Sequence, residues 1–261
     1  MPISGFAENQ RKVVRTMDGK TDAGAPQADA AFAAALRKNE EISAPSKEIQ
    51  TVSPAVVKRL PRYFRFLREL LDKDILRISS RELSAVMQVT ASQIRQDLNC
   101  FGGFGQQGYG YNVRYLYTKI GEILAVNENY AAILIGVGHL GHVIAGSSML
   151  ADRNIQLLAL FDSDPSLIGQ TAAGLRIRAA AELPLFLRDI AADIAILALP
   201  PDAAEKTAAE LAQLGIHGIW NFSGREIALP GADIAVENVH FDDSLMRLMY
   251  SVRIGRSGEG E

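Results

Sequence analysis

The pattern of hydrophobic residues changes character near residue 130. Between residues 54 and 73, apolar residues recur at the three- and four-residue spacing of an amphipathic helix, with Pro61 expected to kink or divide it. Beyond residue 130 the apolar positions instead form continuous runs that alternate with helical stretches. These runs lie at residues 131–137, 155–161 and 194–199. Continuous apolar strands alternating with helices are typical of a parallel sheet covered on both faces, so the pattern predicts an α/β fold with a helical module first.

The helical module carries the capping and turn signals of a winged helix. Capping boxes at residues 79–82 and 90–93 open two short helices, and a brief turn between them indicates a helix-turn-helix. Residues 102–111 are rich in glycine and predict a β-hairpin, after which Asn112 caps a further helix. A helix-turn-helix followed by a hairpin predicts an N-terminal winged-helix domain over residues 47–126.

A glycine motif, Gly136-x-Gly138-x-x-Gly141, follows the first apolar strand and opens a helix that is expected to run to residue 149. Such a motif needs its first glycine for a tight turn, its second for close approach of a pyrophosphate, and its third for packing of the helix on the sheet. The phosphates would lie at the positive end of that helix. The candidate cofactor-binding residues here are Gly136, Val137, Gly138, His139, Leu140 and Gly141. The alternative is a strand-to-helix turn that only packs.

An acidic residue, Asp162, ends the next strand about 20 residues beyond the motif, where dinucleotide-binding folds hold the adenosine ribose. Its carboxylate would accept hydrogen bonds from the ribose hydroxyls and repel a 2′-phosphate, which favours NAD(H) over NADP(H). The alternative is a solvated aspartate at a strand end. The motif and Asp162 together predict a Rossmann-type parallel-sheet domain over residues 127–240.

The chain offers little that a dehydrogenase needs besides the cofactor site. Hydride transfer requires an acid-base group and a substrate-holding arginine beside the nicotinamide. No segment long enough for a separate substrate domain follows the third apolar run. We therefore expect the cofactor to act as a signal and the chain not to be an enzyme. The alternatives are an NAD-dependent oxidoreductase with a fused winged helix and a scaffold related to CoA-binding domains.

The balance of basic and acidic residues also changes between the helical module and the segment with the apolar strands. Residues 46–119 hold 12 Lys and Arg against 6 Asp and Glu, whereas residues 120–261 hold 9 against 18. A basic first module predicts a polyanionic partner, and a winged helix makes double-stranded DNA the natural one. The alternatives are a merely solvated basic face and a winged helix that binds protein.

The second helix of a helix-turn-helix enters the major groove, and its outward residues face the base edges. Here Ile94 and Leu98 are expected to face the core, and Asp97 is expected to orient Arg95 or a neighbour rather than to face DNA. The outward candidates for reading bases are Ser92, Gln93, Arg95, Gln96 and Asn99. Arg59 and Arg62 of the first helix, and Gln106 of the hairpin, are further candidates for contact with DNA.

Composition excludes several other classes of protein. The single cysteine, Cys100, cannot form an internal disulfide, and no His/Cys cluster has the spacing of metal ligands, so no metal is expected. The longest apolar run falls short of the about 18 residues that a membrane span needs. The first residues lack a charged leader with an apolar core. We expect a soluble, cytoplasmic protein, with residues 1–46 as a disordered arm and residues 255–261 as a tail.

Several segments occur in a characteristic order: RQDLNCFGGFG at residues 95–105, GVGHLG at residues 136–141, FDSDP at residues 161–165 and VENV at residues 236–239. They resemble the Rex family of redox-sensing transcriptional repressors. The resemblance implies a homodimer that binds a palindromic operator when NADH is scarce and releases it when NADH accumulates. It also implies that residues 241–254 form a C-terminal dimerisation helix, swapped onto the Rossmann domain of the partner subunit.

Discrimination between NADH and NAD⁺ must arise at the nicotinamide, because the two forms share the rest of the molecule. The positive ring of NAD⁺ loses solvation in an apolar pocket, a cost that neutral NADH avoids. Leu199 and Pro200 are expected to line this pocket, together with Phe241 of the partner subunit. The sequence departs from the family at Gln106, where a Lys or Arg is usual, and at His240, where an aspartate is usual. Fewer cations on the wing predict a shallower dependence of DNA binding on salt.

Overall fold

The structure is a computed structural model. It describes residues 52–99, 105–106 and 110–257. The chain divides into two compact units that part between Glu128 and Asn129. We call them the winged-helix unit and the Rossmann unit and describe each by itself. The arm expected over residues 1–46, Cys100, Gln107 and the end of the tail lie outside the described residues.

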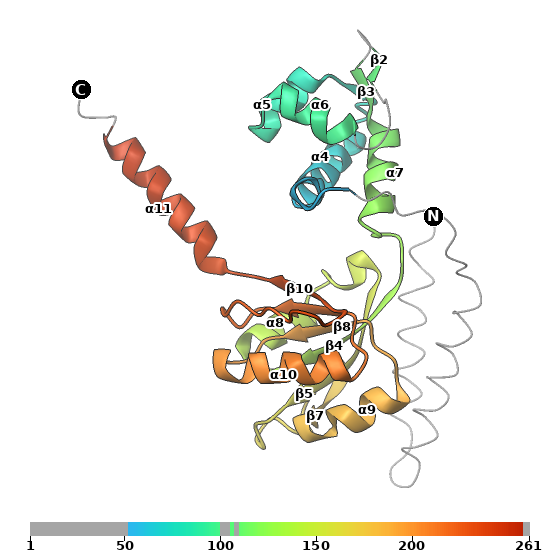
Figure 1. Ribbon diagram of the computed structural model, residues 1–261, viewed down its shortest axis with the longest axis vertical. Helices are drawn as coiled ribbons and strands as arrows, with labels where there is room; N and C mark the ends of the chain where they lie inside the picture. The colour runs from blue at the N-terminus through green and yellow to red at the C-terminus, as the bar shows by residue number, and fades with distance from the viewer. Residues whose placement is uncertain (1–51, 100–104, 107–109, 258–261) are drawn as a thin grey trace. The chain divides into compact units, whose positions relative to one another are not determined.

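The winged-helix unit is a set of helices with a small sheet (Figure 1). Its elements are α3 (Pro54–Val57), α4 (Leu60–Asp72), β1 (Arg77–Ile78), α5 (Ser80–Met87), α6 (Ala91–Asn99), β2 (Gly105–Gln106), β3 (Gly110–Asn112) and α7 (Val113–Ile123). The first helix is divided as expected, because Pro61 takes an early position in α4, where its missing N–H breaks no hydrogen bond. The expected capping box is present, since Ser79 Oγ accepts from Glu82 N at 3.1 Å and Glu82 Oε2 accepts from Ser79 N at 2.7 Å.

The hairpin forms an antiparallel sheet with a strand that the sequence pattern does not reveal. The strand order is β1-β3-β2, with Ile78 opposite Tyr111 and Gln106 opposite Gly110. Gly110 has φ +70°, and a Cβ there would lie 2.7 Å from the carbonyl oxygen of Ile78. Glycine is therefore required where β3 passes β1.

One hydrophobic core joins the helices of this unit. Its fully buried side chains include Leu60 and Leu67 of α4, Leu83 of α5, Ile94 and Leu98 of α6, and Leu116 and Ile120 of α7. Ile94 and Leu98 thus face the core, as expected. The core fixes α6 against α4 and leaves the opposite side of α6 exposed.

The Rossmann unit is a parallel sheet with helices on both faces (Figure 1). Its elements are β4 (Tyr130–Ile135), α8 (His139–Gly146), η1 (Ala151–Arg153), β5 (Ile155–Asp162), β6 (Thr171–Ala172), β7 (Leu175–Ala179), η2 (Ala180–Glu182), α9 (Leu183–Asp189), β8 (Ile194–Leu197), α10 (Pro201–Gln213), β9 (Gly218–Asn221), β10 (Ala235–Asn238) and α11 (Phe241–Ser257). The strand order is β10-β9-β8-β4-β5-β7-β6, and all neighbours are parallel except β6 and β7. The chain moves outward from β4 to β7 and then returns to β8 on the other side of β4. This is the doubly wound order of dinucleotide-binding folds.

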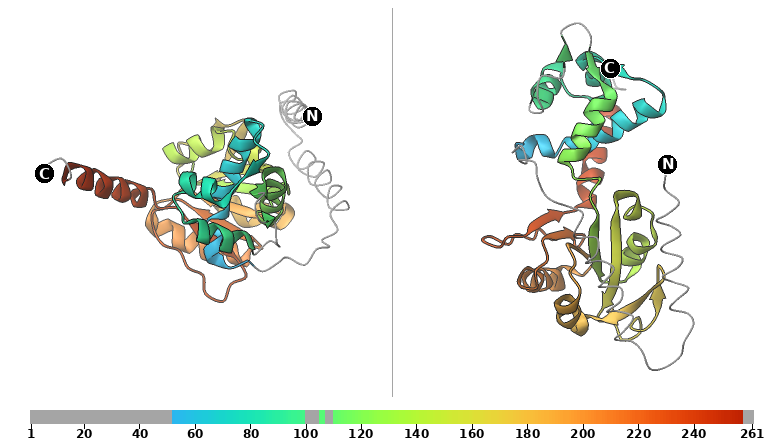
Figure 2. Two further views of the ribbon diagram at one scale, coloured as in Figure 1. Left: turned by 90° about the horizontal axis from the view of Figure 1, so that it is seen from above. Right: turned by 90° about the vertical axis from the view of Figure 1, so that its right-hand side faces the viewer.

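Alternate residues of the apolar strands supply two separate cores, which explains why the strands are apolar throughout. Ile133 and Ile135 pack in a cluster with residues of α9 and α10. Ala132 and Leu134 pack on the other face with Ile144 of α8. The views in Figure 2 show these helices on opposite sides of the sheet.

The structure differs from the sequence expectation in several places within this unit. The helix after the glycine motif was expected to run to residue 149, but it ends at Gly146, and Ser147 is extended with ψ 151°. The sequence pattern also missed β6, β7 and α9. Glycine has low helix propensity, which accounts for the early end of α8.

The last helix, α11, makes few contacts with the rest of its unit. Every side chain from Phe241 to Ile254 is exposed, and the helix stands apart from the sheet at the end of β10 (Figure 1). Its large apolar side chains are 45–68% exposed. None of the described helices is both long enough and apolar enough to span a bilayer.

Candidate cofactor and DNA sites

The three glycines of the motif are required for different reasons. Gly136 has φ +93°, and a Cβ there would collide with the carbonyl oxygen of Ala198. A Cβ on Gly141 would collide with the carbonyl oxygen of Gly136. Gly138 has an ordinary φ of −70°, and a Cβ on it would meet no heavy atom within 4 Å. The fold therefore demands the first and third glycines, whereas the second faces open space, where a pyrophosphate would approach.

The motif presents the N-terminus of α8 to that space. Gly138 is the N-cap and is exposed, and His139 is the first residue of the helix. Unpaired N–H groups and the helix dipole favour an anion at such a position. His142 is turned back to the helix start, with its Nδ1 3.1 Å from the carbonyl oxygen of Gly138. Val137 is buried and Leu140 is half-buried, so these two side chains hold the loop on the sheet.

Asp162 lies at the end of β5 beside the loop and is only 8% exposed. Its Oδ2 accepts a hydrogen bond from Val137 N at 2.6 Å, and its Oδ1 accepts one from Asp164 N at 2.8 Å. An ionised carboxylate accepts about four hydrogen bonds, so both oxygens keep capacity for a ribose diol. Asp162 is thus a positioning group for the glycine loop as well as the expected ribose acceptor.

The expected nicotinamide residues lie at the switch point of the sheet, between β4 and β8, where open α/β sheets bind ligands. Leu199 follows β8, and its Cδ2 would lie 3.1 Å from a Cβ on Gly136, so it borders the glycine loop. Pro200 is exposed and is the N-cap of α10. Phe241 is 60% exposed and stacks on Phe222 of its own chain, with ring centroids 5.9 Å apart. Its expected place against the nicotinamide of the partner subunit stays a prediction.

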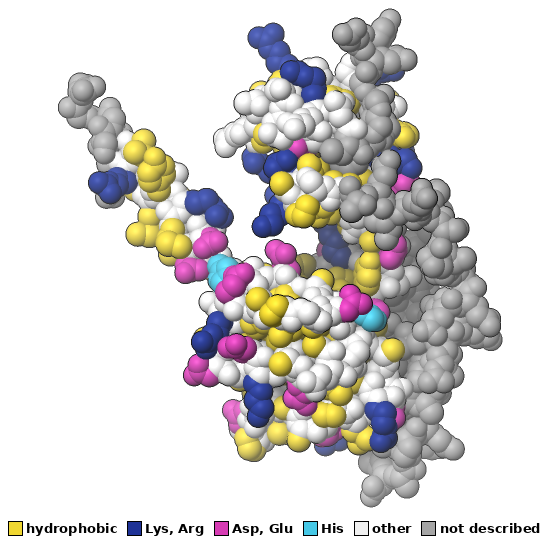
Figure 3. Space-filling model, in the orientation of Figure 1, with side chains coloured by type: hydrophobic (Ala, Val, Ile, Leu, Met, Phe, Trp, Pro, Cys, Tyr) yellow, Lys and Arg dark blue, Asp and Glu magenta, His cyan; other side chains and the backbone are white. Residues whose placement is uncertain are grey.

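The outward side of α6 presents most of the residues predicted to read DNA. Ser92, Arg95, Gln96 and Asn99 are exposed, and Arg95 Nη1 donates to Ser80 Oγ of α5 at 3.3 Å. Lys and Arg side chains gather over this unit (Figure 3). Arg62 is exposed on α4. The backbone of Gln106 lies in β2, but its side chain is outside the described part of the chain.

Two other predicted DNA contacts, Arg59 and Gln93, have a partner inside the unit. Arg59 Nε and Nη2 donate to the two oxygens of Asp97 at 2.7 and 2.6 Å, which is a bidentate ion pair. Gln93 Nε2 donates to Asp97 Oδ1 at 2.9 Å, and Tyr63 Oη donates to Asp97 Oδ2 at 3.1 Å. Their expected contacts with DNA stay predictions.

The same contacts modify two expectations about α6. In the capping box expected at its start, Thr90 Oγ1 accepts from Gln93 N at 3.1 Å, but the side chain of Gln93 turns to Asp97. Asp97 was expected to orient Arg95 or a neighbour, and the structure gives it Arg59 of α4. Its full burial follows from its place three residues after Ile94, on the inner face of the helix. That spacing is the signal by which the sequence marks Asp97 as a buried acid in need of a partner.

The electrostatics of this cluster keep Asp97 ionised. Burial alone would raise the pKa of Asp97, but the hydrogen bonds from Arg59, Gln93 and Tyr63 outweigh it and hold the pKa below its ordinary value. The hydrogen bond to Asp97 raises the pKa of Arg59. Burial, and then the charge of Asp97, raise the pKa of Tyr63, so its hydroxyl remains a donor. Charge-assisted hydrogen bonds of this kind are short and strong, so they fix α6 on α4.

Comparison with known proteins assigns the chain to a family. A family model described as "Putative DNA-binding protein N-terminus" matches residues 51–99, and one described as "CoA binding domain" matches residues 127–224. A redox-sensing transcriptional repressor Rex of Clostridium botulinum is 47% identical over 203 residues, which cover 78% of this chain and 96% of that protein. The chain belongs to the Rex family. The Rex of Clostridioides difficile is 44% identical over 207 residues, which cover 79% of this chain and 98% of that one.

Solved Rex structures share the fold. The crystal structure of RSP, a Rex-family repressor, is 42% identical with a TM-score of 0.74, and the match covers 80% of this chain and 97% of that one. A structure of RSP in complex with beta-NAD⁺ and operator DNA is 45% identical with a TM-score of 0.71, over 81% and 98% of the two chains. The fold class predicted from the sequence is confirmed, and as a Rex protein the chain is a redox-sensing transcriptional repressor rather than an oxidoreductase. Among the described residues, no group of three or more potential metal ligands comes together.

Proposed function

We propose that this Rex protein binds a palindromic operator as a homodimer and releases it when NADH rises relative to NAD⁺. The observation that carries the proposal is the contrast within the glycine motif. Gly136 and Gly141 are demanded by the fold, but neither backbone conformation nor packing accounts for Gly138, which faces open space at the start of α8. A bound dinucleotide accounts for it. The relative RSP has been crystallised with beta-NAD⁺ and operator DNA and with beta-NADH.

The cofactor would lie along the carboxyl end of the sheet. Its pyrophosphate would approach Gly138 and the N-terminus of α8, and its adenosine ribose would bind Asp162. Its nicotinamide would reach Leu199 and Pro200. A neutral reduced ring is the better occupant beside an apolar side chain, because the oxidised ring loses solvation there.

The DNA would meet the exposed side of α6. Arg95 suits guanine, and Gln96 and Asn99 suit adenine, through bidentate hydrogen bonds in the major groove. Ser92, Gln93 and Gln106 remain further candidates, and Arg59 and Arg62 remain candidates for phosphate contact. The Asp97 cluster holds α6 on α4, so the reading helix is oriented before it meets DNA.

A second copy of the chain is the expected partner of α11. The exposed apolar side chains of this helix include Phe241, Leu245, Leu248, Met249 and Val252. Such a row is rarely left in water on a stable monomer, and in a symmetric dimer each subunit can bury the row of the other. A homodimer also places two copies of α6 on two half-sites, as a palindromic operator requires. We place the protein in the cytoplasm, with the DNA and the NAD(H) pool.

The decisive experiment is a mobility-shift titration on an operator selected from random duplexes. NADH, NAD⁺ and CoA are added separately to the complex of the full chain with this operator. Release by NADH at a concentration at least about tenfold lower than by NAD⁺, a difference of about 1.4 kcal/mol, supports the proposal. Release by CoA in preference to NADH, or indifference to all three compounds, would contradict it.

A further inference from the structure

The loop after β9, residues 222–227, contacts the starts of two helices of the Rossmann unit. One is α10, which begins directly after Leu199 and Pro200, and the other is α11. We propose that Arg225 and Glu226 are positioning residues that couple the cofactor end of the sheet to the start of α11. This inference rests on the proposed function, which assigns the nicotinamide to the start of α10 and dimerisation to α11.

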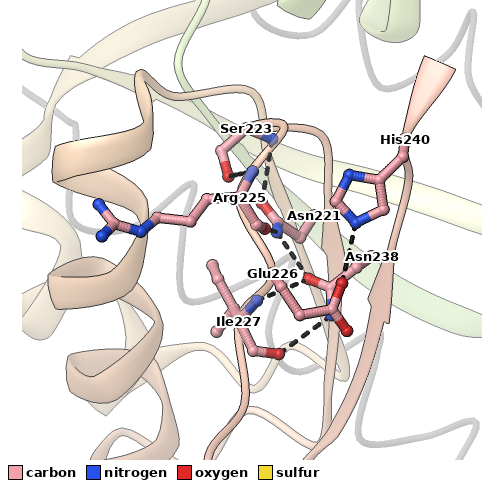
Figure 4. A network of polar contacts seen from close by, with 7 residues as sticks. All are labelled: Asn221, Ser223, Arg225, Glu226, Ile227, Asn238 and His240. Atoms are coloured by element: carbon pink, nitrogen blue, oxygen red, sulfur yellow. Dashed lines mark hydrogen bonds and ion pairs between the residues drawn. The ribbon is translucent and has the colours of Figure 1, made fainter. Parts of the chain in front are cut away.

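The backbone of the loop is fixed by two asparagine side chains at the ends of β9 and β10 (Figure 4). Asn221 is 1% exposed, and its Nδ2 donates to the carbonyl oxygen of Arg225 and to Asn238 Oδ1, both at 2.7 Å. Asn238 also binds both backbone groups of Ile227, accepting from its N at 3.1 Å and donating to its carbonyl oxygen at 3.0 Å. Because both strands hold it, the loop moves with the sheet edge as one body.

Two residues of the loop, Phe222 and Glu226, contact the junction between β10 and α11. Glu226 Oε2 lies 2.9 Å from Nε2 of His240, the residue before the helix (Figure 4). Phe222 stacks on Phe241, the first residue of the helix, at an interplanar angle of 28°. The hydrogen bond to Glu226, and then the charges of Asp243 and Asp242, raise the pKa of His240. These contacts hold the residues on both sides of the point where α11 begins.

A third residue of the loop, Arg225, contacts the first two turns of α10. Arg225 Nη1 lies 3.4 Å from Asp202 Oδ1, and Arg225 Nε lies 3.7 Å from Glu205 Oε2. All three side chains are about half exposed or more, so these ion pairs add little to stability. Removal of these pairs should therefore leave the fold intact, so that an effect on NADH release can be separated from an effect on stability.

Together these contacts form a continuous route between the two helix starts. A reduced ring beside Leu199 displaces the start of α10, Arg225 carries the displacement to the loop, and Glu226 passes it to His240. The direction of α11 then changes at its first turn. Because α11 joins the two subunits, a small change there alters the spacing of the two DNA-reading helices.

The test compares four full-length proteins: the wild type, Arg225→Ala, Glu226→Ala and the control Glu237→Ala, which removes an exposed carboxylate from β10. The measurements are the NADH concentration for half-release of the operator, the operator affinity without cofactor, and the thermal midpoint. We expect Arg225→Ala and Glu226→Ala to raise the half-release concentration about 2- to 5-fold. Operator affinity and thermal midpoint should match those of Glu237→Ala. A role in folding alone would lower the midpoint and leave the half-release concentration unchanged.

Two further variants sharpen the result. Glu226→Gln keeps an acceptor for the Nε2–H of His240 and should restore most of the response. The double variant Arg225→Ala/Glu226→Ala should lose less than the product of the single losses, because both residues act on one route. If the wild type is not released by NADH, the proposed function fails. If it is released and the loop variants respond like Glu237→Ala, only the coupling through the loop is overturned.

Discussion

The winged-helix unit buries a carboxylate between two of its helices, whereas the Rossmann unit buries polar side chains at the ends of its strands. Asp97 is fully buried between α4 and α6 and forms an ion pair with the guanidinium of Arg59. The buried polar residues described in the Rossmann unit, Asp162 and Asn221, bind backbone groups of the adjoining loops. Asp97 accepts from a charged side chain of another helix, whereas the carboxylate of Asp162 accepts from backbone N–H groups of neighbouring loops. The comparison therefore separates an ion pair that joins two helices from side chains that fix the loops at one edge of a sheet.

The largest effect is expected from removing the buried charge. Asp97→Ala leaves Arg59 and Tyr63 without their acceptor, and breaking one side of a buried ion pair costs about 3 kcal/mol, at the low end because Arg59 remains 33% exposed. The single tryptophan, Trp220, lies in β9 and reports on the Rossmann unit alone. We expect unfolding followed by far-ultraviolet circular dichroism to begin earlier, while the fluorescence transition of Trp220 stays in place.

The matched control for this substitution is Asp72→Ala, which removes an exposed carboxylate at the end of α4. It should leave both transitions unchanged. An Asp97→Ala protein as stable as the Asp72→Ala protein would show that the cluster does not hold α6 on α4. A coincident fall of both transitions would show that the two units unfold together.

The next largest effect separates two glycines of one loop. Gly141→Ala forces a methyl group against the carbonyl of Gly136, and overpacking of this kind costs about 1–3 kcal/mol. Its Trp220 transition should fall accordingly. Gly138→Ala meets no protein atom, so its stability should equal that of the wild type while its affinity for NADH falls about tenfold. Equal NADH affinity of Gly138→Ala and the wild type, measured by calorimetry, would show that the dinucleotide does not bind at this loop.

An element can be predicted from the sequence when its own residues carry a pattern, and not when only its pairing with a distant strand defines it. The long apolar strands and the glycine motif carry their own local signals, so β4, β5 and the start of α8 are predicted from sequence. The two residues of β1 have no periodicity, and only their pairing with β3 defines them as a strand. β6 is equally short and is defined by its pairing with β7.

The candidate sites follow the same division. The positive φ of Gly136 is a local property of the turn after β4. Its contact with Ala198 arises only because β4 pairs with β8. The ion pair of Arg59 with Asp97 joins residues 38 positions apart, and only the packing of α4 on α6 brings them together. Sequence reasoning therefore assigned Arg59 to the surface. The spacing of Asp97 after Ile94, on the buried face of α6, is the clue that a buried acid there needs a partner.

The smallest effect expected is a difference in how the two units respond to acid. Because the folded state lowers the pKa of Asp97, its contribution is fully present above the ordinary value of about 3.9 and is lost as pH falls through the lowered value. His240 has a raised pKa, so its pair with Glu226 is present below about 6.5 and is lost as pH rises through the raised value. Acid should thus weaken the winged-helix unit through Asp97. Asp97→Asn should flatten the acid dependence of the circular dichroism transition and leave the Trp220 transition unaffected. A wild type and an Asp97→Asn protein with the same slope between about pH 5 and pH 3 would show that Asp97 does not titrate against the fold.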